Sequence, residues 1–215
     1  RDAHEFIPDV AAKGAAAIVV EKDVTPIDGI TYIKVEDSRL ALACMSAAYF
    51  GHPAKKLKTI GITGTKGKTT TTYMVRSILE SAGIKTGLIG TIESIVGSER
   101  IPSANTTPES YRVQELFAKM VDAGLDAVVM EVSSQALMLH RVSGFVFDIG
   151  VFTNLEPDHI GEMSTRILQI ICTARVFCSS SAGMEFLMGT ASICRAFYRD
   201  IPVRLRRLGM EQKMI

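Results

Sequence analysis

A glycine-rich segment followed by lysine and threonine is the strongest chemical signal in this chain. It reads Gly61-Ile62-Thr63-Gly64-Thr65-Lys66-Gly67-Lys68-Thr69-Thr70. It lies between a predicted strand over 59–63 and a predicted helix over 68–82, which is the context of a phosphate-binding loop. Glycines let backbone N–H groups point at phosphate oxygens, Lys68 supplies a positive charge, and the Thr69 hydroxyl is a possible Mg²⁺ ligand. The competing interpretation is a glycine-rich turn that holds no ligand.

The loop departs from the strict G-x-x-x-x-G-K-[ST] pattern by one place. Ile62 stands where the first glycine of that pattern belongs, and glycines occur at 61, 64 and 67 instead. We expect the side chain of Lys66 to be solvated rather than catalytic. The residues predicted to bind ATP are Gly64, Thr65, Lys66, Gly67, Lys68, Thr69 and Thr70.

The elements that must position this loop follow an α/β pattern. Apolar periodicity predicts strands at 16–21, 31–35, 59–63, 86–91, 126–132 and 147–153, and helices at 4–14, 39–50, 68–82, 107–123 and 134–140. Such alternation favours a parallel sheet whose working loops follow the carboxyl ends of the strands. Gly51-His52-Pro53 interrupts the pattern and predicts a linker. We therefore expect a partial N-terminal domain over 1–54 and an incomplete central P-loop-type ATPase domain over 55–161.

Glu131 is the second candidate for chemistry. It ends a predicted apolar strand and is followed by Val132-Ser133-Ser134-Gln135. In a parallel sheet, a carboxylate at this place would face the phosphate loop. Taken alone, a glutamate at a strand end is more often a solvated edge residue.

These motifs together resemble the Mur ligase family, and within it the UDP-N-acetylmuramoyl-tripeptide synthetases. Folylpolyglutamate synthetases have a similar nucleotide loop. The resemblance covers about residues 1–161 and implies a smaller α/β UDP-binding domain before the ATPase domain. It implies an ATP-dependent amide-forming ligase of peptidoglycan precursor synthesis. ATP would phosphorylate a carboxylate of UDP-N-acetylmuramoyl-L-alanyl-D-glutamate, and the amine of a diamino acid would displace the phosphate.

The resemblance also implies roles for single residues around the nucleotide. The residue that matches Glu131 binds Mg²⁺ in the family, and a hard carboxylate oxygen suits that cation. The segment Phe152-Thr153-Asn154-Leu155-Glu156-Pro157-Asp158-His159 resembles a loop whose histidine helps to hold a second Mg²⁺. We predict Lys68, Glu131 and His159 as catalytic residues and Thr69, Glu131 and His159 as metal ligands. The cofactors are then ATP and Mg²⁺.

A third group of residues resembles the family's contacts to the UDP-N-acetylmuramoyl dipeptide. Thr106 and Thr107 precede Pro108-Glu109, and this segment is predicted to cap and open a helix. Ser133 and Arg141 match two further contacts, and a guanidinium suits phosphate or carboxylate. We therefore predict Thr106, Thr107, Ser133 and Arg141 as substrate-binding residues.

Composition limits the other function classes. The formal net charge of +1 gives no general attraction to nucleic acid, and no apolar stretch is long enough to span a bilayer. The four cysteines lack paired C-x-x-C spacing, which favours a reduced, cytoplasmic protein. Because the chain starts at Arg1 without a leader, we expect further residues upstream.

The last part of the chain, 162–215, differs from the rest. Ten of the eleven lysines precede it, whereas seven of the thirteen arginines lie within it, so the composition changes from lysine to arginine. Read with a shift of one base and free synonymous codons, the segment from Glu162 gives NEHENFADYLHGKSLLFKQCRYGIFN, which resembles the family's continuation. The family's metal-binding lysine would be encoded across Ala174 and Arg175. We therefore expect an out-of-frame tail without a native fold, and a chain that is inactive alone.

Two other functions stay open at this point. One is a related ligase that adds glutamate to folate, against which Thr106-Thr107-Pro108 and the pair Ser133 and Arg141 argue. The other is a non-catalytic nucleotide-binding fragment, which ATP binding without an amide product would favour. The choice between meso-diaminopimelate and lysine as the amine does not follow from the sequence.

Overall fold

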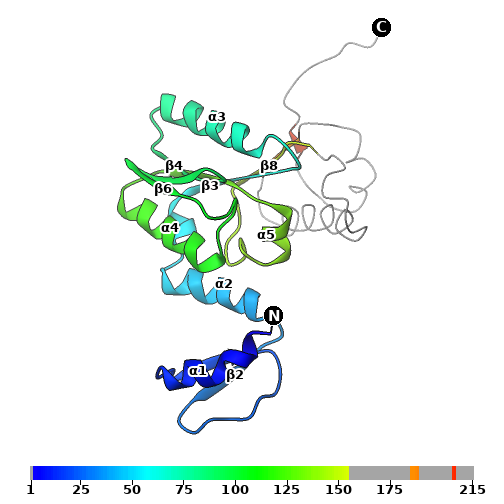
Figure 1. The fold of residues 1–215 in the computed structure, drawn as a ribbon. Coiled ribbons are helices and arrows are strands. Elements are labelled where there is room, and N and C mark those ends of the chain that lie inside the picture. The colour runs from blue at the N-terminus through cyan, green and yellow to red at the C-terminus, as the bar shows by residue number, and fades with distance from the viewer. Residues whose placement is uncertain (1, 155–184, 189–204, 207–215) are drawn as a thin grey trace.

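The structure is a computed structural model that describes residues 2–154, 185–188 and 205–206 (Figure 1). The chain begins with a small α/β unit. It contains the 3-10 helix η1 (Ala3–Phe6), helix α1 (Ile7–Ala12), strands β1 (Ala17–Val20) and β2 (Thr31–Lys34), and helix α2 (Ser38–Tyr49). Strands β1 and β2 pair in parallel, with Ala17 opposite Thr31. The two strands of this unit form a sheet separate from the central one.

The central sheet carries the candidate site. After the 3-10 helix η2 (Pro53–Lys56) come β3 (Lys58–Thr63), α3 (Lys68–Ser81), β4 (Thr86–Ile89), β5 (Glu93–Val96), β6 (Glu99–Pro102), α4 (Ser110–Asp122), β7 (Ala127–Glu131), α5 (Ser134–Met138), β8 (Ile149–Phe152), β9 (Glu185–Met188) and β10 (Leu205–Arg206). The described strand order is β10-β9-β8-β3-β7-β4-β5-β6. Strands β10 through β4 pair in parallel, whereas β5 and β6 add two antiparallel partners at one edge.

Helices cover both faces of this sheet, with α3 on one side and α4 on the other (Figure 1). The alternation of side chains along β7 explains the two layers. Val128 and Met130 pack into the cluster that includes the α4 residue Phe117. Val129 packs into the opposite cluster with Ile60 and Ile62 of β3, against which α3 side chains lie. All five residues of β7 are buried, as expected for a central parallel strand.

The small N-terminal unit is anchored to the central one through α2. Helix α2 packs against α4, and the α2 cap residue Asp37 lies 3.3 Å from His140 Nε2. Gly144 passes so close to α2 that an added Cβ would lie 2.7 Å from the Ala43 carbonyl oxygen. Its φ of +87° is also one that favours glycine, so two separate constraints select glycine here.

The α/β class and the parallel sheet that the sequence predicts are confirmed, but two local predictions are wrong and one hairpin was missed. The segment 4–14 forms a 3-10 turn and a short helix rather than one helix. The hairpin of β5 and β6 was not predicted, although its two-residue turn contains Gly97 at φ +59°. Helix α4 starts at Ser110 instead of 107, because Thr107 uses its hydroxyl elsewhere and caps nothing. No helix in the described ranges has the length and apolar character needed to cross a bilayer.

Candidate functional site

The glycine-rich segment forms a tight loop between β3 and α3. The strand ends at Thr63, residues 64–67 turn, and the helix begins at Lys68. Gly64 has φ +139°, and an added Cβ would lie 2.1 Å from Thr153 Oγ1, so no other residue fits without a local shift. Gly67, at φ +80°, is the N-cap of α3. The loop therefore brings the positive end of α3 next to a run of backbone N–H groups.

The end of β8 holds this loop closed. The Thr65 amide donates to the Asn154 carbonyl oxygen at 3.0 Å, and the Lys66 amide donates to Asn154 Oδ1 at 2.9 Å. In return, Thr153 Oγ1 and Asn154 Nδ2 donate to the Lys66 carbonyl oxygen at 2.8 and 3.0 Å. The shape of the loop thus depends on two residues almost ninety positions away in the sequence.

The Lys68 ammonium lies at the mouth of the loop. Its Nζ donates to the carbonyl oxygens of Gly64 at 2.8 Å and Thr65 at 3.1 Å. These acceptors are neutral, so an anionic oxygen arriving at the same place would form a stronger, charge-assisted hydrogen bond. The arrangement suits a phosphate group.

Glu131 is buried at the end of β7, next to the loop. Its side chain is 1% exposed, yet both oxygens have donors. Oε2 accepts from Thr69 Oγ1 at 2.9 Å and from Thr91 Oγ1 at 3.0 Å, while Oε1 accepts from the Thr91 amide at 2.9 Å. An added Cβ on Gly90 would lie 2.5 Å from Oε1, so the chain passes Glu131 without room for a larger residue.

The Thr69 hydroxyl and the Glu131 carboxylate fit a Mg²⁺ ion in chemical type. Mg²⁺ takes hard oxygen ligands and usually combines one or two carboxylates with phosphate oxygens and water. In residues 2–154 and the two short described strands, no cluster of three or more His, Cys, Asp or Glu side chains could form a complete protein cage. Phosphate oxygens and water are the ligands that would complete such a Mg²⁺ site.

The four residues predicted to bind the acceptor substrate lie close to the backbone of Glu131. Thr107 Oγ1 donates to the Glu131 carbonyl oxygen at 2.9 Å and accepts from the Ser133 amide at 3.0 Å. Ser133 Oγ caps α5 by accepting from the Ala136 amide at 3.1 Å. Arg141 donates to the Thr107 carbonyl oxygen at 3.1 Å, and Thr106 Oγ1 lies 3.1 Å from Thr91 Oγ1. One hydrogen-bonded network therefore joins the two groups of predicted residues.

A tyrosine on the rim of the site is electrostatically perturbed. Burial raises the pKa of Tyr73, and the hydrogen bond to Glu93 adds to the rise. Tyr73 Oη donates to Glu93 Oε1 at 2.9 Å, and Arg100 Nη1 donates to the same oxygen at 2.6 Å. The tyrosine is therefore a neutral hydrogen-bond donor at physiological pH.

The structure brings some of the residues predicted from the sequence together and leaves others apart. Lys68, Thr69 and Glu131 lie together, and Thr70 is exposed on the first turn of α3. His159 lies outside the described residues. Sequence reasoning missed Thr91, whose signal was a hydroxyl residue at the carboxyl end of a strand beside the one ending in Glu131. It also gave no role to Asn154, which holds the loop.

The amino-acid sequence matches one protein family and several curated proteins. The pattern of the family described as Mur ligase middle domain matches residues 62–177, which is more than half of the chain. The chain belongs to the Mur ligase family. It is 55% identical over 159 residues to a UDP-N-acetylmuramoyl-L-alanyl-D-glutamate--2,6-diaminopimelate ligase of Clostridium perfringens, covering 74% of this chain and 33% of that protein. A protein of the same name from Geobacter metallireducens is 46% identical, with 74% of this chain and 31% of that protein covered.

Solved structures of Mur ligases and their relatives share the fold. A UDP-N-acetylmuramoyl-L-alanyl-D-glutamate--2,6-diaminopimelate ligase superposes with a TM-score of 0.70 at 21% identity, covering 86% of this chain and 37% of the other. A bifunctional folylpolyglutamate synthase/dihydrofolate synthase of Yersinia pestis, complexed with AMPPNP and manganese, gives 0.61 at 18% identity over 81% of this chain and 48% of the other. The chain spans about a third of the length of the curated Mur ligases that it matches.

Proposed function

We propose that this chain carries the ATP-binding and acceptor-binding core of a Mur-type ligase that joins a diamino acid to UDP-N-acetylmuramoyl-L-alanyl-D-glutamate. The observation that carries the proposal is that Glu131 makes two hydrogen bonds, one through its side chain and one through its backbone. Its side chain contacts Thr69 of the glycine-rich loop, and its backbone carbonyl accepts from Thr107 of the acceptor segment. The nucleotide side and the acceptor side thus meet at one buried residue.

On the nucleotide side, the loop amides and Lys68 bind the phosphates of ATP. Thr69 and Glu131 hold Mg²⁺, with His159 as the predicted ligand of a second ion. When bound, Mg²⁺ would offset the charge that builds up as one anion attacks another. Lys68 exchanges its two neutral carbonyl partners for a phosphate oxygen, and it stabilises negative charge in a preorganised position.

On the acceptor side, Thr106, Thr107, Ser133 and Arg141 bind the anionic dipeptide substrate. Arg141 is 14% exposed at its side chain, and its orientation is fixed by a 2.7 Å contact with Glu109 Oε1. The hydrogen bond of Thr91 to Thr106 places the acceptor segment directly beside the residue that holds Glu131. This proximity supports transfer of a phosphoryl group from ATP to the acceptor carboxylate, followed by attack of the amine.

The relatives' names favour 2,6-diaminopimelate as the amine. A folate-glutamating ligase is less well supported, because the structural likeness to those enzymes is a likeness of fold at low identity. The acceptor network of Thr107, Ser133 and Arg141 is what separates the two proposals.

The proposal is tested by calorimetric titration of the chain with ATP in the presence of Mg²⁺. Lys68→Ala should weaken binding at least tenfold, since it removes a charge-assisted hydrogen bond worth about 1.5–3 kcal/mol. Lys85→Ala, an exposed lysine before β4, is the matched control and should bind normally. Equal affinity of the Lys68→Ala and wild-type chains would refute the nucleotide assignment. Product analysis with both amines, carried out on a chain whose shifted reading frame has been restored, then separates a ligase from a non-catalytic nucleotide-binding fragment.

A further inference from the structure

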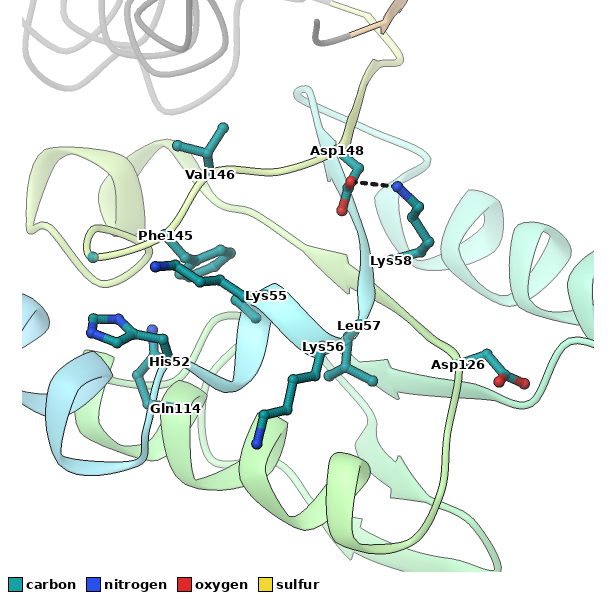
Figure 2. Close-up of a pocket in the computed structure, with 12 residues that line it drawn as sticks. His52, Lys55, Lys56, Leu57, Lys58, Gln114, Asp126, Phe145, Val146 and Asp148 are labelled. Atoms are coloured by element: carbon teal, nitrogen blue, oxygen red, sulfur yellow. Dashed lines mark hydrogen bonds and ion pairs between the residues drawn. The ribbon is translucent and has the colours of Figure 1, made fainter. Parts of the chain in front are cut away.

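A cavity lies at the amino-terminal ends of the central strands, on the side of the sheet opposite the glycine-rich loop (Figure 2). Its volume is about 800 Å³. Lys58 at the start of β3, Asp126 before β7 and Asp148 before β8 all line it. These residues mark the amino-terminal ends of three parallel strands, whereas the loop follows the carboxyl end of β3. The cavity is therefore separate from the candidate nucleotide site.

The charges that line this cavity leave a positive excess. Asp148 Oδ1 accepts from Lys58 Nζ at 2.9 Å, which pairs these two charges, whereas Asp126 Oδ2 accepts from the neutral backbone amide of Lys85 at 2.9 Å. Lys55 and Lys56 also line the cavity and are exposed, and neither forms an ion pair within the described part of the chain. The lining carries three lysines against two acids, and Lys55 extends toward Phe145 whereas Lys56 points away from it (Figure 2).

A buried amide on the α4 side of the cavity has no partner. Gln114 is 1% exposed, and neither its Oε1 nor its Nε2 has a hydrogen-bond partner among the described residues. Buried side-chain amides are nearly always paired, and an unpaired one needs an explanation such as an absent ligand. Because Gln114 is one of the lining residues, an occupant could supply both a donor and an acceptor.

The remaining wall is apolar. Leu57 is 5% exposed, Val146 is 60% exposed, and the Phe145 ring stacks edge-on against Phe117 with ring centroids 5.0 Å apart. A fixed aromatic ring beside an exposed valine suits a flat apolar body. Figure 2 shows Phe145 and Val146 on the segment that leads into Asp148, across the cavity from Gln114.

We propose that this cavity binds a small amphipathic anion. Its carboxylate or phosphate group pairs with Lys55, its apolar body lies on Phe145 and Val146, and a polar group on it hydrogen-bonds Gln114. Mixed lining of this kind, mostly apolar with a few convergent polar groups, is typical of small-molecule sites. The proposal does not depend on the proposed ligase function, because the two sites share no residue.

Three probes with one aromatic body test the charge requirement. 1-Naphthyl phosphate and 1-naphthoate are titrated into the full chain and followed by naphthalene fluorescence, and neutral 1-naphthol is the control. We expect saturable binding of one or both anions, at least tenfold tighter than naphthol. The anion that binds more tightly identifies phosphate or carboxylate as the preferred group. Equal binding of naphthol, or no saturable binding of either anion, would overturn the proposal.

Variants then locate the binding. Lys55→Gln should weaken anion binding at least tenfold, whereas Lys56→Gln should weaken it less, because Lys56 points away from Phe145, and Lys85→Gln should leave it unchanged. Gln114→Leu should also weaken binding but leave the melting temperature of the free chain unchanged or higher, since it removes an unpaired buried amide. Unchanged anion binding in the Lys55→Gln variant, or displacement of the probe by ATP at its own dissociation constant, would place the probe elsewhere and refute this site.

Discussion

The Thr69 hydroxyl donates to Glu131 Oε2 at 2.9 Å, joining the first turn of α3 to the last residue of β7. The two residues are 62 positions apart. Their contact depends on parallel pairing of β3 with β7, which places Ile62 opposite Glu131. A hydroxyl and a carboxylate already in contact can both turn toward one cation with little rearrangement.

Glu131→Gln should remove most of the Mg²⁺ dependence of ATP binding. The substitution keeps the shape of the side chain but replaces a charged oxygen with an amide, which is a poor Mg²⁺ ligand. We expect the ratio of ATP affinities with and without Mg²⁺ to fall about tenfold or more. Calorimetric titration in Mg²⁺ and in EDTA measures that ratio, and a ratio equal to that of the wild-type chain would exclude Glu131 as a ligand.

Thr91→Val should also weaken Mg²⁺-dependent ATP binding, by about tenfold. Valine retains the backbone N–H that donates to Oε1 but lacks the hydroxyl that donates to Oε2. Thr91→Ser restores the hydroxyl and should recover most of the affinity. If serine and valine weaken binding equally, the residue acts through packing and not by orienting the carboxylate.

Gly64→Ala should disturb the glycine-rich loop more than Gly83→Ala disturbs its own turn. Both glycines have positive φ, but an added Cβ at Gly83 meets nothing within 4 Å, whereas at Gly64 it would lie 2.1 Å from Thr153 Oγ1. The backbone penalty common to both is about 1 kcal/mol. We expect the Gly64 variant alone to lose ATP affinity, as measured by titration alongside thermal melting. Normal nucleotide binding in that variant would mean that the Thr153 contact is dispensable.

The pair of Lys58 and Asp148 predicts a pH dependence of stability. Burial pulls the pKa of Asp148 upward, but hydrogen bonds from Lys58 and Thr59 outweigh it and hold the pKa below 3.8. A lowered pKa means that this carboxylate stabilises the folded chain above about pH 3.8, and that the contribution is lost as the pH falls through the folded value. Asp148→Asn should therefore cost about 1 kcal/mol at pH 7, and this cost should decrease as the pH falls below 3.8.

Urea unfolding at a series of pH values checks this expectation. Asp23→Asn is a suitable control because its partner Lys34 is exposed and lies in the small N-terminal unit. A destabilisation by Asp148→Asn that stays constant from pH 3 to pH 7 would show that the charge of Asp148 plays no part.

The altered composition after residue 161 predicts a change in the DNA rather than in the fold. Sequencing through the codons for Ile160 to Met163 should find one additional base, which would restore a lysine across the codons for Ala174 and Arg175. Only β9 and β10 of this tail are described, and β9 pairs in parallel with β8. Confirmation of the written frame would leave the tail as a genuine part of the protein.

The sequence was most informative where local chemistry and element order coincide. The glycine-rich loop, Lys68 and the buried strand ending in Glu131 were all predictable, because glycine spacing and apolar runs report directly on backbone geometry. Thr107 was predicted as a helix cap, but its hydroxyl donates to the Glu131 carbonyl oxygen, a contact set by tertiary packing. Thr91 and Asn154 could not be assigned for the same reason. Their partners lie 40 and 88 residues away, and only the strand order brings them together.

The hydrogen bonds of Thr153 and Asn154 to the glycine-rich loop couple the conformation of that loop to the position of the end of β8. Pairing of β8 with β3 positions Thr153 and Asn154, and these two residues hold the loop in shape. This pairing should therefore raise the affinity of the loop for nucleotide by some factor. Thermodynamic linkage then requires bound nucleotide to favour the docking of β8 by the same factor. A nucleotide bound at one end of the sheet would in this way stabilise the pairing of β8 with β3. Amide hydrogen exchange of Val151 and Phe152 should therefore slow when ATP is added.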